Sequence, residues 1–200
     1  MFAERTIIIK THRNVRRANN DDKGARMEFN IEMAIPMLQA TPNVVSAMLA
    51  GLDDAWVQTN YGPETFCPFD VIGHLIHGER EDWVPRAKII LEFGEDRVFD
   101  QFDRYAMFKD SKGKTIHELL ATFSRLRAEN VDALRALELT PADLLKTGTH
   151  PVFGAVTLKS LLATWVAHDQ NHIHQIAKCL AYQYREAVGP WDEYLTFVSR

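Results

Sequence analysis

The segment TIHELLATFSRLRAENVDALRAL carries the strongest structural signal in this chain of 200 residues. Thr115 and Glu118 form a T-x-x-E capping box, a typical helix start in which each of the two side chains bonds the backbone N–H of the other residue. Seven apolar residues then recur at helical spacing: Ile116, Leu119, Leu120, Phe123, Leu126, Val131 and Leu134. The pattern predicts an amphipathic helix over about 115–137, whose apolar face must pack against other elements.

Helical patterns also precede this segment. Thr41 suits an N-cap and Pro42 the first helical position, so we expect a helix to begin there and to reach Leu52. An earlier helical piece, at about 28–40, is expected to be bent or broken by Pro36 and Pro42.

A second long helix is predicted over about 68–93. Cys67 occupies its N-cap position, Asp70 follows as a capping-box acid would, and Gly94 marks the stop. Pro85 lies inside this helix and predicts a kink, because proline lacks the N–H that the helix requires.

The last long helix is predicted over about 157–187, ending before Gly189 and Pro190. Residues 95–114 are expected to form a loop rich in charged and aromatic residues, and loops of this length are often functional. The stretch from Leu139 to Val156 is predicted to be mostly connection, with a short helix starting at Pro141. With no strand alternation, the sequence predicts an all-α four-helix bundle with short extra helices.

Charge separates the first 26 residues from the rest. Residues 1–26 carry seven Lys/Arg and three Asp/Glu, a net charge of +4, so residues 27–200 carry −8 of the total of −4. We therefore expect a basic N-terminal extension, disordered or irregular, followed by an acidic bundle domain over 27–200. An acidic domain disfavours nucleic acid as a partner, although the basic arm alone leaves a nucleic-acid tail open.

The chain contains two cysteines, far apart and without a CxxC motif. It shows no secretion signal and no apolar run of membrane-spanning length, so we expect a reduced, cytoplasmic protein with no membrane partner.

Histidines give the chief functional signal. In HDQNH, His168 and His172 are four residues apart, so they share one face of the last helix. Gln175 and Cys179 continue that face. His174 lies about 200° around the helix from His172 and is not expected to join them.

The second helix carries Asp70, His74 and His77 on one face. One histidine from this helix and two from the last would make a three-nitrogen site, and three protein ligands with open positions are typical of a catalytic metal. Spacing alone leaves open that these are packed or exposed histidines. A zincin motif is disfavoured, because Asp169 replaces its Glu, and the paired E-x-x-H motifs of a di-iron bundle are absent.

Several stretches together resemble the DinB-like superfamily, which includes bacillithiol S-transferases. They are TPNVVSAMLAGL, DVIGHLIHGEREDWVPRAKIILE, FDRYAMF, HPVFGAVTLKSLLATWVAHDQNHIHQIAK and QYREAVGPW. The resemblance covers about residues 41–198. It implies a four-helix bundle in which His74, His168 and His172 bind a divalent metal ion.

The resemblance also implies an activity. The metal would activate water or a thiol for transfer, isomerisation or hydrolysis on a small substrate, which includes a low-molecular-weight thiol as a candidate. Imidazole ligands leave the ion open among Zn²⁺, Ni²⁺ and Fe²⁺. A homodimer is expected on the same ground. The alternative is a non-catalytic metal-binding or stress-response protein.

Three more residues near the histidines have open roles. His77 is a candidate catalytic residue, a fourth ligand or a packing residue. Asp70 and Asp169 are candidates to orient imidazole N–H groups. Asp169 points about 100° away from His168, so it is expected to contact another helix, and Asp70 also suits a simple helix cap.

Overall fold

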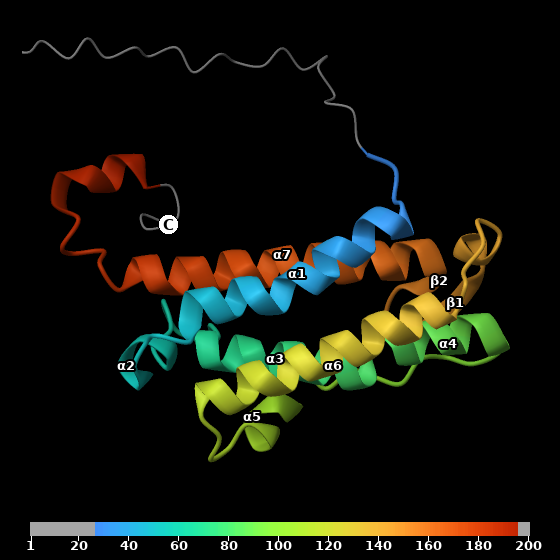
Figure 1. The fold of residues 1–200 in the computed structure, drawn as a ribbon, viewed down its shortest axis with the longest axis horizontal. Coiled ribbons are helices and arrows are strands. Elements are labelled where there is room, and N and C mark those ends of the chain that lie inside the picture. Colours follow the sequence, from blue (N-terminus) through green and yellow to red (C-terminus); the bar gives the residue numbers. More distant parts are fainter. Residues whose placement is uncertain (1–26, 196–200) are drawn as a thin grey trace, which may run out of the picture.

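Four helical segments run side by side along the molecule in the computed structural model, which describes residues 27–195 (Figure 1). They are α1 (Ile31–Leu49), α3 (Pro68–Glu81) followed by α4 (Trp83–Phe93), α6 (Ile116–Ala136) and α7 (Leu158–Tyr182). Helix α1 packs against α6 and α7, and α3 packs against the same two helices. The predicted all-α four-helix bundle is confirmed. No helix within residues 27–195 is both long and apolar enough to cross a membrane.

Short elements connect the four segments. They are α2 (Asp54–Val57), α5 (Ala106–Asp110), the 3-10 helices η1 (Asp143–Leu145) and η2 (Gly189–Tyr194), and the antiparallel strands β1 (Thr147–His150) and β2 (Gly154–Thr157). The predicted basic extension, residues 1–26, lies outside the described residues.

Helix α6 begins as predicted. Thr115 is its N-cap, the Thr115 N–H donates to the Glu118 carboxylate at 2.7 Å, and the Glu118 N–H donates to the Thr115 hydroxyl at 3.2 Å. Helix α7 also begins where expected, with the Thr157 side chain as its cap, but it ends at Tyr182. The prediction that it continues to residue 187 is wrong; turns lead from there into η2.

The predicted helix start at Thr41 is wrong, because α1 begins at Ile31, after its N-cap Asn30, and continues through Pro36 and Pro42. Pro42 cannot donate to the carbonyl of Leu38, four residues earlier. That carbonyl instead accepts a bond from Arg127 of α6, at 2.8 Å. A contact from another helix thus removes much of the cost of the proline.

The predicted helix over 68–93 is two helices, broken at Asp82, where φ is −108° and ψ is −82°. Pro85 accounts for the position of the break, because it offers no N–H to the carbonyl of Glu81 and its ring would clash with that group. The break turns the Asp82 carboxylate toward Arg86, at 2.9 Å.

The β1–β2 hairpin was not predicted. Its strands have four residues each and no apolar alternation, so the sequence gives little sign of them. The expected loop holds α5, and Val98 pairs with Thr149 of β1. At Gly148, a Cβ atom would lie 2.7 Å from Ile90 Cγ1, so glycine lets the hairpin pack closely on α4.

The apolar core has two parts with a polar layer between them. One part surrounds Trp83 and Trp165, and the other surrounds Leu75 and Phe123. Each of the four bundle segments contributes one buried polar residue between the two parts: Thr41 of α1, Glu79 of α3, Arg127 of α6 and Asp169 of α7. We call these four residues the polar layer.

Arg127 lies at the centre of this layer and is 1% exposed. Its five N–H groups make five bonds: two to Glu79 (3.0 and 2.7 Å), two to Asp169 (3.0 and 2.5 Å) and one to Leu38 O. The Thr41 hydroxyl donates to Asp169 at 2.7 Å, and Trp165 Nε1 donates to Glu79 at 3.2 Å. The layer therefore links all four segments.

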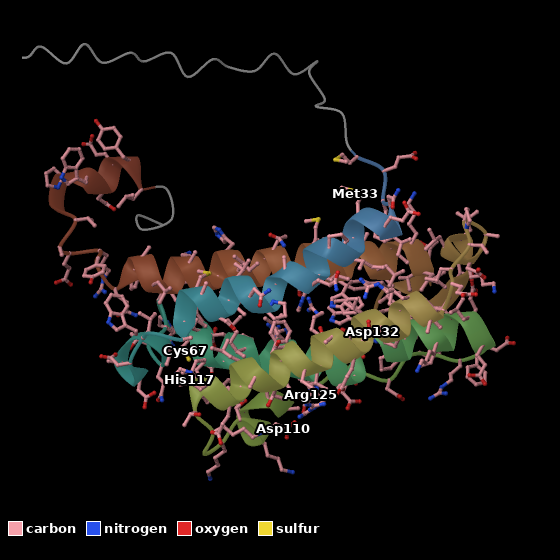
Figure 2. The ribbon with its side chains drawn as sticks, viewed as in Figure 1. Met33, Cys67, Asp110, His117, Arg125 and Asp132 are labelled. Atoms are coloured by element: carbon pink, nitrogen blue, oxygen red, sulfur yellow. The ribbon has the colours of Figure 1, made fainter. Side chains whose placement is uncertain are left out.

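Replacing Arg127 by Met should lower the free energy of unfolding by about 3–5 kcal/mol, because the buried carboxylates of Glu79 and Asp169 lose their counter-charge. Urea denaturation measures the change. Arg125 lies on the same helix with its side chain 59% exposed, paired to Glu129 at 2.7 Å (Figure 2). Arg125→Met should cost less than about 1 kcal/mol. Equal effects of the two variants would contradict a structural role for the polar layer.

Candidate metal centre

The centre is built by two helices of the bundle that face each other. His74 lies on α3, and His168 and His172 lie one turn apart on α7. Helix α3 starts at Cys67, whose N–H donates to the Asp70 carboxylate at 3.1 Å. Asp70 therefore serves as the helix cap, one of the two roles expected for it, and orients no imidazole of the centre.

The three histidines converge through their Nε2 atoms. His168 Nε2 lies 3.2 Å from His74 Nε2 and 3.1 Å from His172 Nε2. Within residues 27–195, these three form the one group of His, Cys, Asp or Glu side chains whose ligand atoms all lie within 4.8 Å of one another. The structure therefore brings together the three residues that the sequence predicts as ligands.

These separations suit a bound metal ion. Metal–nitrogen bonds of ~2.0–2.1 Å in a tetrahedral centre place the ligand nitrogens ~3.3 Å apart. Two of the three nitrogen–nitrogen distances in the centre, those from His168, lie close to that value. Three nitrogen lone pairs directed at one point repel each other unless a proton or a cation lies between them, so the donor set fits a divalent ion.

Different contacts orient the three rings. His172 Nδ1 lies 2.9 Å from Gln175 Oε1, so the ring donates through Nδ1 and its Nε2 lone pair stays free for a metal. His74 packs between Phe66 and Phe102, and His168 packs edge-on against Trp83. The Nδ1 atoms of His74 and His168 are buried and have no hydrogen-bond partner among residues 27–195. Packing, rather than hydrogen bonding, fixes those two rings.

Burial keeps the cluster neutral. It lowers the pKa of His74 to about 4, with a further contribution from the positive charge that His172 would carry. Burial likewise holds the pKa of His168 well below its usual range and lowers that of His172. Neutral imidazoles are the form that binds metal ions, so the rings are ready to act as ligands near neutral pH.

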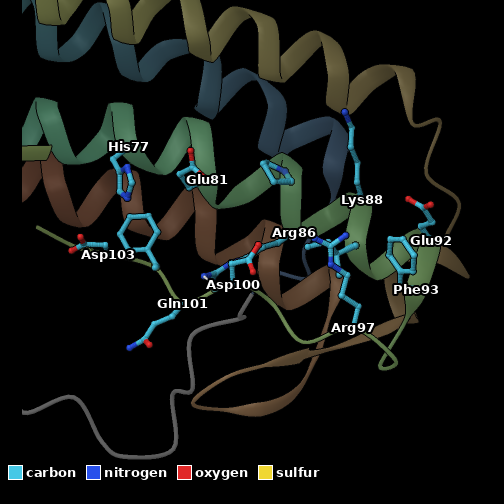
Figure 3. A pocket seen from close by; sticks show the side chains of 13 residues that line it. His77, Glu81, Arg86, Lys88, Glu92, Phe93, Arg97, Asp100, Gln101 and Asp103 are labelled. Atoms are coloured by element: carbon cyan, nitrogen blue, oxygen red, sulfur yellow. Dashed lines mark hydrogen bonds between the residues drawn. The ribbon is translucent and has the colours of Figure 1, made fainter. Parts of the chain in front are cut away.

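His77 lies one helical turn from His74, outside the three-histidine group. Its ring contacts Phe102 at 4.7 Å between centroids and lines an open cavity of about 350 Å³. Figure 3 shows His77 of α3 facing the segment that carries Gln101 and Asp103. His77 therefore lies beside the centre but outside the group of candidate ligands.

Two further predictions, for His174 and Asp169 of α7, are confirmed. His174 is exposed and lies away from the cluster. Asp169 contacts Arg127 of α6 and Thr41 of α1, so it holds other helices as expected.

A second cavity, of about 250 Å³, borders the centre, with His168 as part of its wall. It lies among α4, α7 and the β1–β2 hairpin. Its apolar lining is made by Trp83, Phe99, Phe153, Val156 and Leu161. A small molecule in this cavity would contact the side chain of one of the three histidines.

Arg127 and Glu79 of the polar layer are absent from the sequence predictions, although the position of Arg127 gives a signal. Arg127 follows Phe123 and precedes Val131 by four residues each, so it sits in the middle of the apolar stripe of its helix. A charged residue at such a position indicates a buried ion pair. Its partner Glu79 gives no comparable signal.

Comparisons with known proteins agree with this fold. A sequence model of the DinB superfamily matches residues 37–176, more than half of the chain. YfiT from Bacillus subtilis, described as a probable metal-dependent hydrolase with an unusual four-helix bundle topology, superposes with a TM-score of 0.66 at 24% identity, over 77% of this chain and 89% of its own. That likeness shows a shared fold, and no curated protein matches the sequence. The chain belongs to the DinB superfamily.

Proposed function

We propose that this protein is a divalent-metal-dependent enzyme acting on a small substrate, with His74, His168 and His172 as the ligands. The observation that carries the proposal is the convergence of three Nε2 atoms, with those of His74 and His172 at 3.2 and 3.1 Å from that of His168, on rings whose pKa burial lowers. Three protein ligands leave coordination positions open, which is typical of a catalytic rather than a structural metal.

A divalent ion held there would supply Lewis acidity and would lower the pKa of a coordinated water or thiol. The protein side chains contribute position and exclusion of solvent. His172 is held by Gln175, and Trp83 packs on His168 at 5.1 Å between ring centroids. All-imidazole ligation suits Zn²⁺, Ni²⁺ and Fe²⁺ alike, so each of these ions fits the proposed site.

Hydrolysis is the reaction proposed first. It agrees with the description of YfiT as a probable metal-dependent hydrolase, and the cavity beside His168 offers apolar walls for a small substrate. Transfer to a low-molecular-weight thiol, which the DinB-like resemblance implies, is the second candidate and would use the same open coordination position.

His77 is proposed to act on the substrate rather than on the metal. Its ring lines the cavity of about 350 Å³ together with Phe102, outside the group of converging nitrogens. A group there can reach a substrate that extends past His74.

The homodimer and the cytoplasmic location stay predictions. For the dimer, the exposed side chains of Met33, labelled in Figure 2, and of Met37 on α1 offer an apolar surface next to residues of α7. Burial of such a surface between two copies would be favourable.

Elemental analysis of purified protein tests the ligand set. Wild-type protein should contain one divalent ion per chain, and His74→Ala and His172→Ala should each lose it, because two imidazoles bind far more weakly than three. His174→Ala is the matched control, since His174 is exposed on the same helix, and it should keep the ion, as should His77→Ala. Metal that persists in His172→Ala would place the site elsewhere.

A paired assay tests the activity. Metal-loaded protein should hydrolyse short-chain para-nitrophenyl esters, lose this activity in a chelator and regain it on addition of the ion. A parallel reaction of an aryl halide with a small thiol measures thiol transfer. Metal binding without turnover in either assay would favour a non-catalytic metal-binding protein, which is the alternative.

The pH dependence of stability tests the buried, neutral state of the cluster. The unfolded chain binds protons on histidine below its ordinary pKa of 6.5, whereas burial lowers the pKa of His74 to about 4 in the folded protein. The contribution of the neutral cluster to the free energy of unfolding of metal-free protein should therefore be complete above pH 6.5 and be lost as the pH falls toward 4. Thermal unfolding measures this loss.

A variant with Gln at the three cluster positions should lose less stability over the same pH range, and His174→Ala should behave as the wild type does. If the triple variant and the wild type show the same slope, the cluster is not the source of the pH dependence.

A further inference from the structure

His150 is the last residue of β1 and borders the cavity beside His168. Its Nδ1 atom accepts two backbone hydrogen bonds in the hairpin turn, from the N–H of Val152 at 3.1 Å and from that of Phe153 at 3.2 Å. A ring nitrogen that accepts carries a lone pair, so the proton of the neutral ring must be on Nε2. The turn therefore fixes His150 as an Nε2–H donor.

The ring is also held in place. It stacks on Phe153, with 4.5 Å between ring centroids, and meets Phe99 edge-on at 6.1 Å. Burial and the nearby Arg86 lower the pKa of His150, which favours the neutral ring. Within residues 27–195, the hydrogen bonds of His150 all go to Nδ1, and no protein group accepts from the Nε2–H. This donor is oriented but unused.

Arg86, Ser160 and Thr164, which also line the cavity, have partners within the protein. Arg86 pairs with Asp82 at 2.9 Å and donates to Asp100 O at 3.2 Å. The hydroxyls of Ser160 and Thr164 donate to backbone carbonyls of α7 and its cap, at 2.8 and 2.7 Å. The Nε2–H of His150 is therefore a donor of the cavity wall that a bound molecule can use, whereas the Nδ1 atom of His168, which also has no partner, is buried.

We propose that this cavity binds the substrate of the enzyme, a small ester or thioester with an apolar acyl part, and that His150 is a catalytic residue whose Nε2–H bonds the substrate carbonyl oxygen. The inference rests on the proposed function. The apolar walls receive the acyl part, and His168 places the cavity next to the candidate metal centre.

In the reaction, an electron pair of water forms a bond to the carbonyl carbon, and the π pair of the carbonyl moves onto its oxygen. The Nε2–H of His150 stabilises the charge that develops there and gives up no proton. When the double bond forms again, the bond to the leaving group breaks, and the leaving group departs with the proton that the water has lost. A fixed donor directed at developing charge is an effective source of rate enhancement.

Two variants separate the donor from the turn. Asn at position 150 offers an oxygen near the place of Nδ1, so it keeps an acceptor for the turn but has no group at the place of Nε2. Gln at position 150 places its amide N–H₂ close to the position of Nε2. The two variants are of similar polarity, so a difference between them reports the donor.

The test uses metal-loaded protein with para-nitrophenyl acetate and butyrate. His150→Asn should lower kcat by about 10²–10³-fold, as removal of one donor to the developing oxyanion does in other enzymes. KM should change only slightly, and the metal content should stay the same. His150→Gln should recover part of kcat. Full kcat in His150→Asn, with wild-type protein active, would overturn the inference and leave the proposed function standing.

Calorimetry with butylphosphonate, a probe that carries acceptor oxygens and an apolar chain, tests the role of His150 independently of the proposed hydrolysis. If wild-type protein binds metal but hydrolyses neither ester, the proposed hydrolysis fails, and probe binding decides the role of His150. Weaker binding to His150→Asn than to wild type would support the cavity and its donor, whereas equal binding would overturn them.

Discussion

The guanidinium group of Arg127, buried between Glu79 and Asp169, is the interaction on which this bundle depends. Charge so far from water is tolerated only when every donor is satisfied, and all five N–H groups of Arg127 are bonded. Because the partners come from α1, α3 and α7, the helices cannot slide past α6 without leaving charge unpaired. The polar layer therefore sets the register of the four segments.

That register positions the candidate metal centre. Asp169 follows His168 in α7, and Glu79 lies five residues after His74 in α3. The two carboxylates accept bonds from adjacent edges of one guanidinium, so they hold the two histidine-bearing helices at a fixed separation. The rings meet at Nε2–Nε2 distances of 3.1–3.2 Å without a shared loop or a disulfide. Positioning of the centre and stability of the fold thus have a common source.

Patterns among residues close together in the sequence predicted part of the fold and of the candidate metal centre. The capping box at Thr115 and the spacing of His168 and His172 depend only on near neighbours, and the structure has both arrangements. The third member of the cluster, His74, came from the resemblance together with the fact that bundles build sites from facing helices. That these residues bind metal stays a proposal.

What could not be predicted depends on contacts distant in sequence. The penalty of Pro42 is offset by a bond from Arg127 to Leu38 O, which no local pattern reveals. The hairpin that carries His150 forms because Gly148 packs on α4 and β1 meets Val98, again across long separations.

X-ray absorption at the edge of the bound metal tests the central claim most directly, because it reports the ligand atoms themselves. We expect three imidazole nitrogens at ~2.0–2.1 Å, with water or another non-protein ligand completing the coordination, and loss of the imidazole signal in His172→Ala. A sulfur ligand at ~2.3 Å, or a spectrum that His172→Ala leaves unchanged, would contradict it.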